Sequence, residues 1–157
     1  MAFRLSARSL RNLEGVHPDL VAVAKRAIAI TTVDFGVTEG LRSAERQAQL
    51  RAAGASTVTV SRHQSGHAID VAAYIGPRVS WELPLYYDIA HAFQSAAAEL
   101  AIPVRWGGCW MLLSGLPHTP RGIGQAVQQY SDSRRAQGRR AFIDGPHYEL
   151  PASRYPA

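Results

Sequence analysis

The chain has 157 residues, a length typical of one domain, and its 46% hydrophobic and 18% charged residues are an ordinary globular balance. No apolar run reaches the ~18 residues of a membrane-spanning helix, and the N-terminal segment lacks the continuous apolar stretch of a secretory signal, so we expect no stable membrane insertion. The formal net charge of +5 predicts attraction to polyanions such as nucleic acid, lipopolysaccharide or anionic wall polymers, without choosing among them.

The first predicted elements are a helix over 17–30 and a short strand over 34–41. Pro18 suits the first helical turn, and Asp19 is favourable at the positive end of the helix dipole. Apolar residues then recur at helical spacing as far as residue 28.

The middle of the chain predicts a second helix over 43–54, with Ser43 as its N-cap and Gly54 as its stop. The β-branched stretch 56–60 is typical of a strand or an extended segment. Residues 68–75 alternate between apolar and less apolar side chains, which predicts a strand with one face in the core.

The third and longest predicted helix covers 82–102, with an apolar stripe that includes Leu100. The remaining expected elements are a strand over 103–106, a helix capped by Thr119 within 119–140, and extended pieces at 141–144 and 147–150. These elements predict an α+β fold, with helices packed on a small, mainly antiparallel sheet, and a single domain over 1–157.

The stretch SRHQSGHAID, residues 61–70, concentrates groups that bind metals. His63 and His67 are four residues apart, but Gly66 interrupts and a strand follows, so the spacing does not indicate a histidine pair on one helix face. We expect a turn at Gly66 that brings His63 close to Asp70, and imidazole and carboxylate are both normal zinc donors.

A catalytic zinc site usually has three protein ligands and one position for water. His147, which follows the bend at Gly145 and Pro146, is the candidate third ligand. Asp144 lies three residues earlier, where it could reach a water molecule without binding the metal. Two histidines and one carboxylate, with a second carboxylate nearby, outline a zinc hydrolase.

These residues resemble a known family. SRHQSGHAID matches the SxHxxGxAxD motif of the D-alanyl-D-alanine carboxypeptidase and dipeptidase family of zinc peptidases, whose phage branch contains L-alanyl-D-glutamate endopeptidases used as endolysins. Four further stretches look like later or flanking blocks of that family: TEGLRSAERQAQL, WELPLYYDIA, PVRWGG and DGPHYEL. The resemblance therefore extends over most of the chain.

The resemblance implies roles for the matching positions. His63, Asp70 and His147 would ligate Zn²⁺, and Asp144 would be the general base. Arg42 would face the oxyanion that forms on the substrate carbonyl, a task that suits a side chain that stays charged. Asp144 would take a proton from water and pass it to the leaving amine.

Two other residues are expected to bind substrate. The resemblance assigns Ser61 to substrate positioning, and Glu149 lies two residues beyond His147, on the same face of an extended strand. His67 is expected to support the site or face solvent rather than to bind metal. One departure is Cys109, which follows RWGG where phage relatives often have aspartate, so the preferred peptide could differ.

The expected function is zinc-dependent hydrolysis of the peptide stem of peptidoglycan, at the L-Ala–D-Glu bond, by a phage endolysin. It implies synthesis in the host cytoplasm and access to the cell wall or periplasm through a separate membrane-permeabilising protein. We expect a monomer without a separate cell-wall-binding module. The arginines of 131–140 are a candidate for contact with anionic envelope polymers. The three tryptophans, Trp81, Trp106 and Trp110, are expected in the core or in a pocket wall rather than as a platform that binds sugar.

Three alternatives stay open at this point. The nearest is a D-Ala-D-Ala carboxypeptidase or dipeptidase of the same family. The second is a cysteine peptidase using Cys109, His147 and Asp144, although it leaves His63 and Asp70 unexplained. The most distant is a basic nucleic-acid-binding protein or a structural zinc module. The sequence contains no recognisable nucleic-acid-binding motif.

Overall fold

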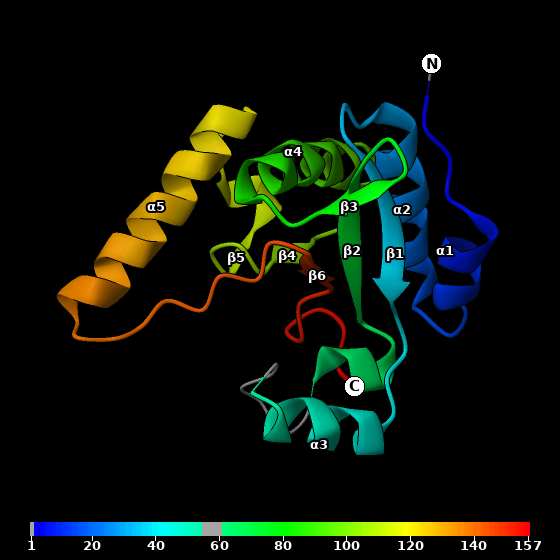
Figure 1. Cartoon of the computed structure of the whole chain (residues 1–157), viewed down its shortest axis with the longest axis horizontal. Coiled ribbons are helices and arrows are strands. Elements are labelled where there is room, and N and C mark those ends of the chain that lie inside the picture. The colour runs from blue at the N-terminus through cyan, green and yellow to red at the C-terminus, as the bar shows by residue number, and fades with distance from the viewer. Residues whose placement is uncertain (1, 55–60) are drawn as a thin grey trace.

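The computed structural model describes residues 2–54 and 61–157 (Figure 1), so the expected strand at 56–60 lies outside the described residues. The helices are α1 (Ala7–Asn12), α2 (Pro18–Ile30), α3 (Ala44–Ala52), α4 (Leu83–Leu100) and α5 (Pro120–Ala136), with short 3₁₀ helices η1 (Arg62–Ser65) and η2 (Leu113–Gly115). The strands are β1 (Asp34–Glu39), β2 (Ala68–Ile75), β3 (Arg78–Ser80), β4 (Arg105–Trp106), β5 (Met111–Leu112) and β6 (His147–Glu149). None of the described helices is long and apolar enough to cross a membrane.

The described strands form one antiparallel sheet in the order β1-β2-β6-β4-β5, with β3 also paired to β2. The long strand β2 therefore lies between the N-terminal strand and the C-terminal strand β6. In this register Asp70 is opposite His147, and Glu149 is opposite Arg105. The α+β prediction with a mainly antiparallel sheet is confirmed.

Helices α2 and α4 pack against each other and cover the sheet, while α1 lies beside β1 (Figure 1). The predicted apolar face of β2 is buried at Ile69 and Val71. Behind the C-terminal strand, the ring of Phe93 from α4 stacks on Tyr148, with 3.8 Å between ring centroids. This packing fixes β6, so the polar side chains of β2 and β6 project from a rigid support.

The predicted helix caps are present. The side chain of Ser43 accepts a hydrogen bond from the backbone N–H of Arg46, and Gly54 adopts a left-handed φ of 77° just after α3. Thr119 caps α5 in the same way, through the N–H of Gly122. The two glycines within α5 are explained by packing, because a Cβ on Gly122 or Gly124 would collide with neighbouring side chains.

Three details differ from the prediction. The N-terminal segment contains the helix α1, which sequence periodicity did not indicate because only Ser9 among its residues is buried. Leu100 belongs to the predicted apolar stripe but is 40% exposed, because the last turn of α4 extends beyond the core. Trp81, expected in the core or a pocket wall, is 63% exposed and lies over the ring of Tyr86.

Candidate active site

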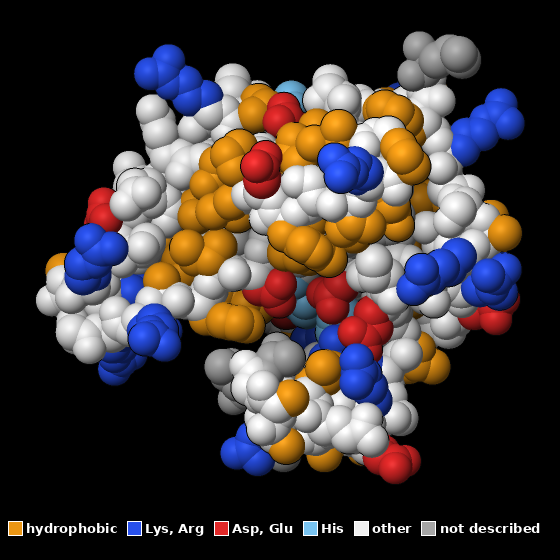
Figure 2. Space-filling view, viewed as in Figure 1, with side chains coloured by type: hydrophobic (Ala, Val, Ile, Leu, Met, Phe, Trp, Pro, Cys, Tyr) orange, Lys and Arg blue, Asp and Glu red, His pale blue; other side chains and the backbone are white. Residues whose placement is uncertain are grey.

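A pocket of about 670 Å³ opens between the sheet and α3. Figure 2 shows acidic side chains and histidines gathered in this hollow, between the main body of the molecule and the lobe formed by α3. The residues predicted to act in catalysis or binding all line it: Arg42, Ser61, His63, Asp70, Asp144, His147 and Glu149. The fold thus brings together residues that are more than 100 positions apart in the sequence.

The turn before β2 positions His63. Ser61 and Gln64 form a capping box around η1, in which the Ser61 hydroxyl accepts a hydrogen bond from the N–H of His63. Gly66 ends the turn with a φ of 76°, and a Cβ there would collide with the carbonyl of Gly15. Ser61 therefore has a clear role in forming the turn, and contact with substrate stays a prediction for it.

One nitrogen of His63 is left free by this arrangement. Its Nδ1 lies 2.9 Å from the carbonyl oxygen of Gly40, which can only accept, so Nδ1 carries the proton. Its Nε2 is buried without a hydrogen-bond donor among the described residues and lies 3.3 Å from Oδ2 of Asp70. A lone pair of His63 thus faces a carboxylate oxygen.

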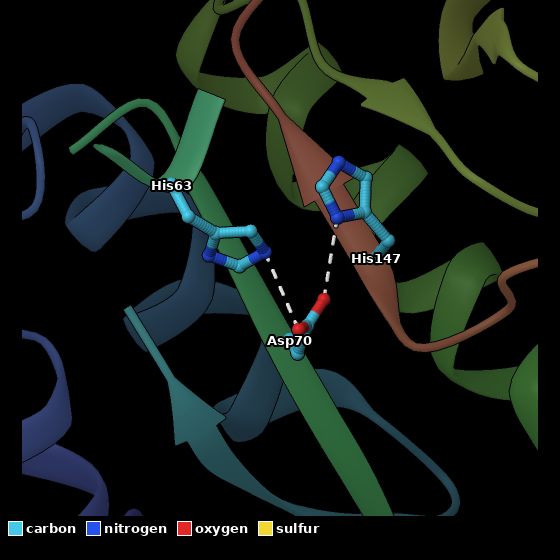
Figure 3. Close-up of side chains that lie close together, drawn as sticks. All are labelled: His63, Asp70 and His147. Carbon is cyan, nitrogen blue, oxygen red and sulfur yellow. Dashed lines mark hydrogen bonds and ion pairs between the residues drawn. The ribbon is translucent and has the colours of Figure 1, made fainter. Parts of the chain in front are cut away.

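His147 reaches the same carboxylate from β6 (Figure 3). Its Nδ1 lies 3.2 Å from Oδ1 of Asp70, and its Nε2 lies 2.8 Å from Oε1 of Glu149. When Nε2–H donates to Glu149, the lone pair of Nδ1 also faces Asp70. Glu149, predicted to bind substrate, is thus in direct contact with His147.

The three side chains could hold a metal ion. One donor atom from each of His63, Asp70 and His147 lies within 4.8 Å of the other two. Two imidazole lone pairs directed at a carboxylate repel it unless a cation lies between them, so the donor set fits a divalent ion. The two-histidine, one-carboxylate set is compatible with zinc and with several other divalent metals.

The local electrostatics favour positive charge at this point. Burial raises the pKa of Asp70, but the contacts of its carboxylate with His147 and His63 outweigh burial and hold that pKa well below its usual range. Burial likewise opposes the charged form of His147, yet the carboxylates of Asp70 and Glu149 raise its pKa to about 9, so a positive charge, either a proton on His147 or a metal ion, is favoured between these groups. Asp70 is therefore an ionised ligand at neutral pH.

Asp144 lies in the loop that leads into β6. Its backbone N–H donates to the carbonyl of Gly107, and its own carbonyl accepts from the N–H of His147, which fixes the residue beside the histidine. Burial first, and then the negative charge of Asp70, raise the pKa of Asp144 to about 6, against the opposing charges of His147, His63 and Arg42. A carboxylate with this pKa is suited to accept a proton near neutral pH.

Arg42 is buried and held in one orientation. Its Nε and Nη2 donate to the two carboxylate oxygens of Glu39 at 2.7 and 2.8 Å, and its Nη1 donates to Gln47 at 2.6 Å. Nη2 also lies 3.5 Å from Oδ2 of Asp70. No sequence signal pointed to a site role for Glu39 or Gln47, although both belong to the TEGLRSAERQAQL stretch.

An aromatic wall, formed by Trp110, Tyr130 and Phe142, closes one side of the pocket. The Trp110 ring lies 5.3 Å from the ring of His147 and stacks on Phe142, and its indole N–H donates to the Phe142 carbonyl. Trp110 has a φ of 59°, uncommon for a residue with a side chain. The expectation that Trp110 forms a pocket wall is confirmed, whereas no sequence signal pointed to Tyr130 or Phe142.

His67 and Cys109 lie outside this arrangement. His67 contacts the Ser65 hydroxyl at 2.7 Å and is not part of the metal-binding group. Burial raises the pKa of the Cys109 thiol, which is the reverse of what an activated thiolate needs. The structure therefore gives no support to a cysteine peptidase.

Comparison with known proteins points to one family. Residues 1–120 match the family model described as phage L-alanyl-D-glutamate peptidase. The L-alanyl-D-glutamate peptidase of Escherichia phage T5 is 35% identical over 154 residues, covering 96% of this chain and 99% of that protein. The crystal structure of the Serratia marcescens L-Ala D-Glu endopeptidase ChiX has 40% identity and a TM-score of 0.76, covering 99% of this chain and 96% of that chain.

Proposed function

Because this chain belongs to the phage L-alanyl-D-glutamate peptidase family, we propose that it is a zinc endopeptidase that cleaves the L-Ala–D-Glu bond of the peptidoglycan stem peptide. The observation that carries the proposal is the group of His63, Asp70 and His147, with Asp144 beside it in the same pocket. This arrangement combines a divalent-metal site with a carboxylate whose pKa of about 6 suits a general base.

The ligands of the ion would be Nε2 of His63, a carboxylate oxygen of Asp70 and Nδ1 of His147. Zinc bound there would act as a Lewis acid and lower the pKa of water from ~15.7 to ~7. Glu149 would orient His147, by accepting the hydrogen bond from Nε2–H.

The chain's own groups supply the proton transfers and the charge stabilisation. Asp144 takes a proton as water attacks the alanyl carbonyl, and then gives it to the departing amine of D-Glu. Arg42 stabilises the negative charge that grows on the carbonyl oxygen, and Glu39 and Gln47 hold its guanidinium in place. Water attacks directly, so no covalent enzyme intermediate forms.

The biological setting belongs to the same proposal. The enzyme would be a monomer, made in the host cytoplasm, in which residues 1–157 form one catalytic domain. A separate membrane-permeabilising protein would give it access to the wall or periplasm. The arginines of 131–140 would add attraction to anionic envelope polymers.

Mass spectrometry of purified peptidoglycan after digestion tests the cleavage directly. The proposal predicts new fragments with N-terminal D-Glu, and none with an Asp144→Ala variant. Release of terminal D-Ala would instead indicate a carboxypeptidase. Unchanged fragments from zinc-loaded protein would refute the peptidase function.

Replacing Glu149 with glutamine is expected to weaken zinc binding by about tenfold or more, because His147 loses a charged hydrogen-bond acceptor. Competition with a chromophoric chelator measures the affinity. Glu45→Gln, an exposed change on α3, is the matched control and should leave it unchanged. Equal affinities for the Glu149→Gln variant and the wild type would show that this contact does not support the metal site.

The pH profile of kcat/KM reports on Asp144. The base works only when ionised, so activity should fall as the pH drops through its pKa, which is about 6 and is lowered further by a nearby cation. We expect the acid limb at pH 6 or below, with the zinc content checked at each pH. An acid limb centred above pH 7 in zinc-loaded protein would contradict this assignment.

A further inference from the structure

The proposed cleavage brings a negative charge to the leaving side of the substrate. Glutamate has two carboxyl groups, and only one of them can join it to the next residue of the stem. The other is free, close to the nitrogen of the bond that is cut. A site that cleaves before D-Glu therefore gains from a fixed cation on that side.

The net charge of the pocket permits binding of a substrate carboxylate. Four arginines and four acidic residues line it. The charges therefore balance when all the acids are ionised, and a divalent ion leaves the pocket with net positive charge. Arg42 pairs with Glu39, and Arg62 donates to the carbonyls of Leu150 and Tyr155. The other two arginines each keep guanidinium nitrogens for which no described residue is an acceptor. Arg105 and Arg134 are the other two.

Arg105 is oriented beside the metal-binding group. Its Nε donates to the backbone carbonyl of Trp110, and its guanidinium carbon lies 5.1 Å from the centre of the Trp110 ring. Its Nη1 lies 3.4 Å from Glu149, which in turn contacts His147. The side chain is 40% exposed, and no described residue accepts a hydrogen bond from its Nη2. Arg105 thus presents a fixed, partly unused guanidinium near the reaction centre.

Arg134 approaches the pocket from α5. Its guanidinium carbon lies 5.9 Å from the centre of the Tyr130 ring. The Tyr130 hydroxyl donates a hydrogen bond to the backbone carbonyl of Phe142 in the aromatic wall. Among the described residues, Arg134 has no ion-pair partner, and its buried Nε has no acceptor. Such an unsatisfied donor is costly unless a ligand or water accepts its hydrogen bond.

Resting on the proposed function, we infer that Arg105 and Arg134 form a carboxylate-binding subsite that recognises the free carboxylate of the D-Glu side of the stem peptide. The subsite makes the enzyme selective for stems whose glutamate carries a carboxylate over stems in which that group is a primary amide. An amide has no charge and offers one acceptor oxygen, so it loses the charge-assisted bonds.

Two synthetic stem peptides that differ only in this group, free acid and primary amide, test the subsite. The wild type should cleave the acid with a kcat/KM at least about tenfold higher, mainly through a lower KM. Arg105→Gln and Arg134→Gln should each reduce this acid-to-amide ratio by raising KM for the acid. Arg105→Lys retains charge and should recover part of the ratio. Arg121→Gln, an exposed change on the same helix as Arg134, should keep the wild-type ratio within about twofold.

Equal cleavage of the two peptides by the wild type would overturn the subsite while leaving the endopeptidase function intact. Arginine variants that lose activity equally on both peptides would overturn it as well. Cleavage of neither peptide by zinc-loaded wild type would instead contradict the proposed function itself.

Discussion

Asp144→Asn is expected to lower kcat for stem-peptide cleavage by roughly 10²–10⁴-fold, the usual effect of losing a general base. Asparagine has nearly the same shape, and the contacts that fix residue 144 are made by its backbone, to Gly107 and His147. The loop should therefore keep its conformation while the group that accepts the proton is lost. Steady-state kinetics on a synthetic L-Ala–D-Glu peptide measure the change.

Two controls give this result its meaning. Asp132→Asn changes an exposed aspartate on α5 and should keep wild-type kinetics. Zinc content should be the same in the Asp144→Asn variant and the wild type, because Asp144 is not one of the three proposed ligands. An Asp144→Asn variant with normal zinc content and a kcat within tenfold of the wild type would exclude Asp144 as the base.

Removal of the metal should abolish cleavage and destabilise the fold. A ligand present at 1,000 times its dissociation constant stabilises the folded state by about 4 kcal/mol. For a chain of this size, each kcal/mol corresponds to a Tm change of about 2–4 °C, so saturating zinc should raise Tm by roughly 8–16 °C over the chelated protein. Differential scanning calorimetry with and without chelator measures this shift, and zinc should restore activity.

An Asp70→Asn variant provides the matched control for metal removal. It keeps the size of the side chain but removes the negative charge that both histidines face. Its Tm should respond little to zinc, and it should be inactive. Full cleavage by wild-type protein in excess chelator, or an equal zinc response in the variant, would contradict a catalytic metal at this place.

The local part of the site could be predicted from the sequence, because it depends on short-range geometry. The turn at Gly66 and the alternation of 68–75 indicated that His63 and Asp70 would meet, and they do, at 3.3 Å. The contact between Asp70 and His147 joins residues 77 positions apart and depends on the register of β2 with β6. Spacing alone does not determine that register, and the family resemblance supplied the pairing.

The pocket walls were less predictable, because they too depend on strand pairing and backbone conformation that residue spacing does not determine. Arg105 and Glu149 meet because β4 pairs with β6, and Trp110 faces His147 through an unusual backbone conformation. Neither feature leaves a periodic signal in the sequence. The errors at Leu100 and Trp81 have a related cause, since hydrophobicity does not show where a helix or hairpin extends beyond the core.

A crystal structure of the zinc-loaded protein, with anomalous data collected at the zinc edge, would show whether His63, Asp70 and His147 bind one metal ion. We expect a single strong peak, about 2.0–2.2 Å from Nε2 of His63, an oxygen of Asp70 and Nδ1 of His147, with one coordination position left to solvent. A peak bound by other residues, or none between these three in active protein, would contradict it.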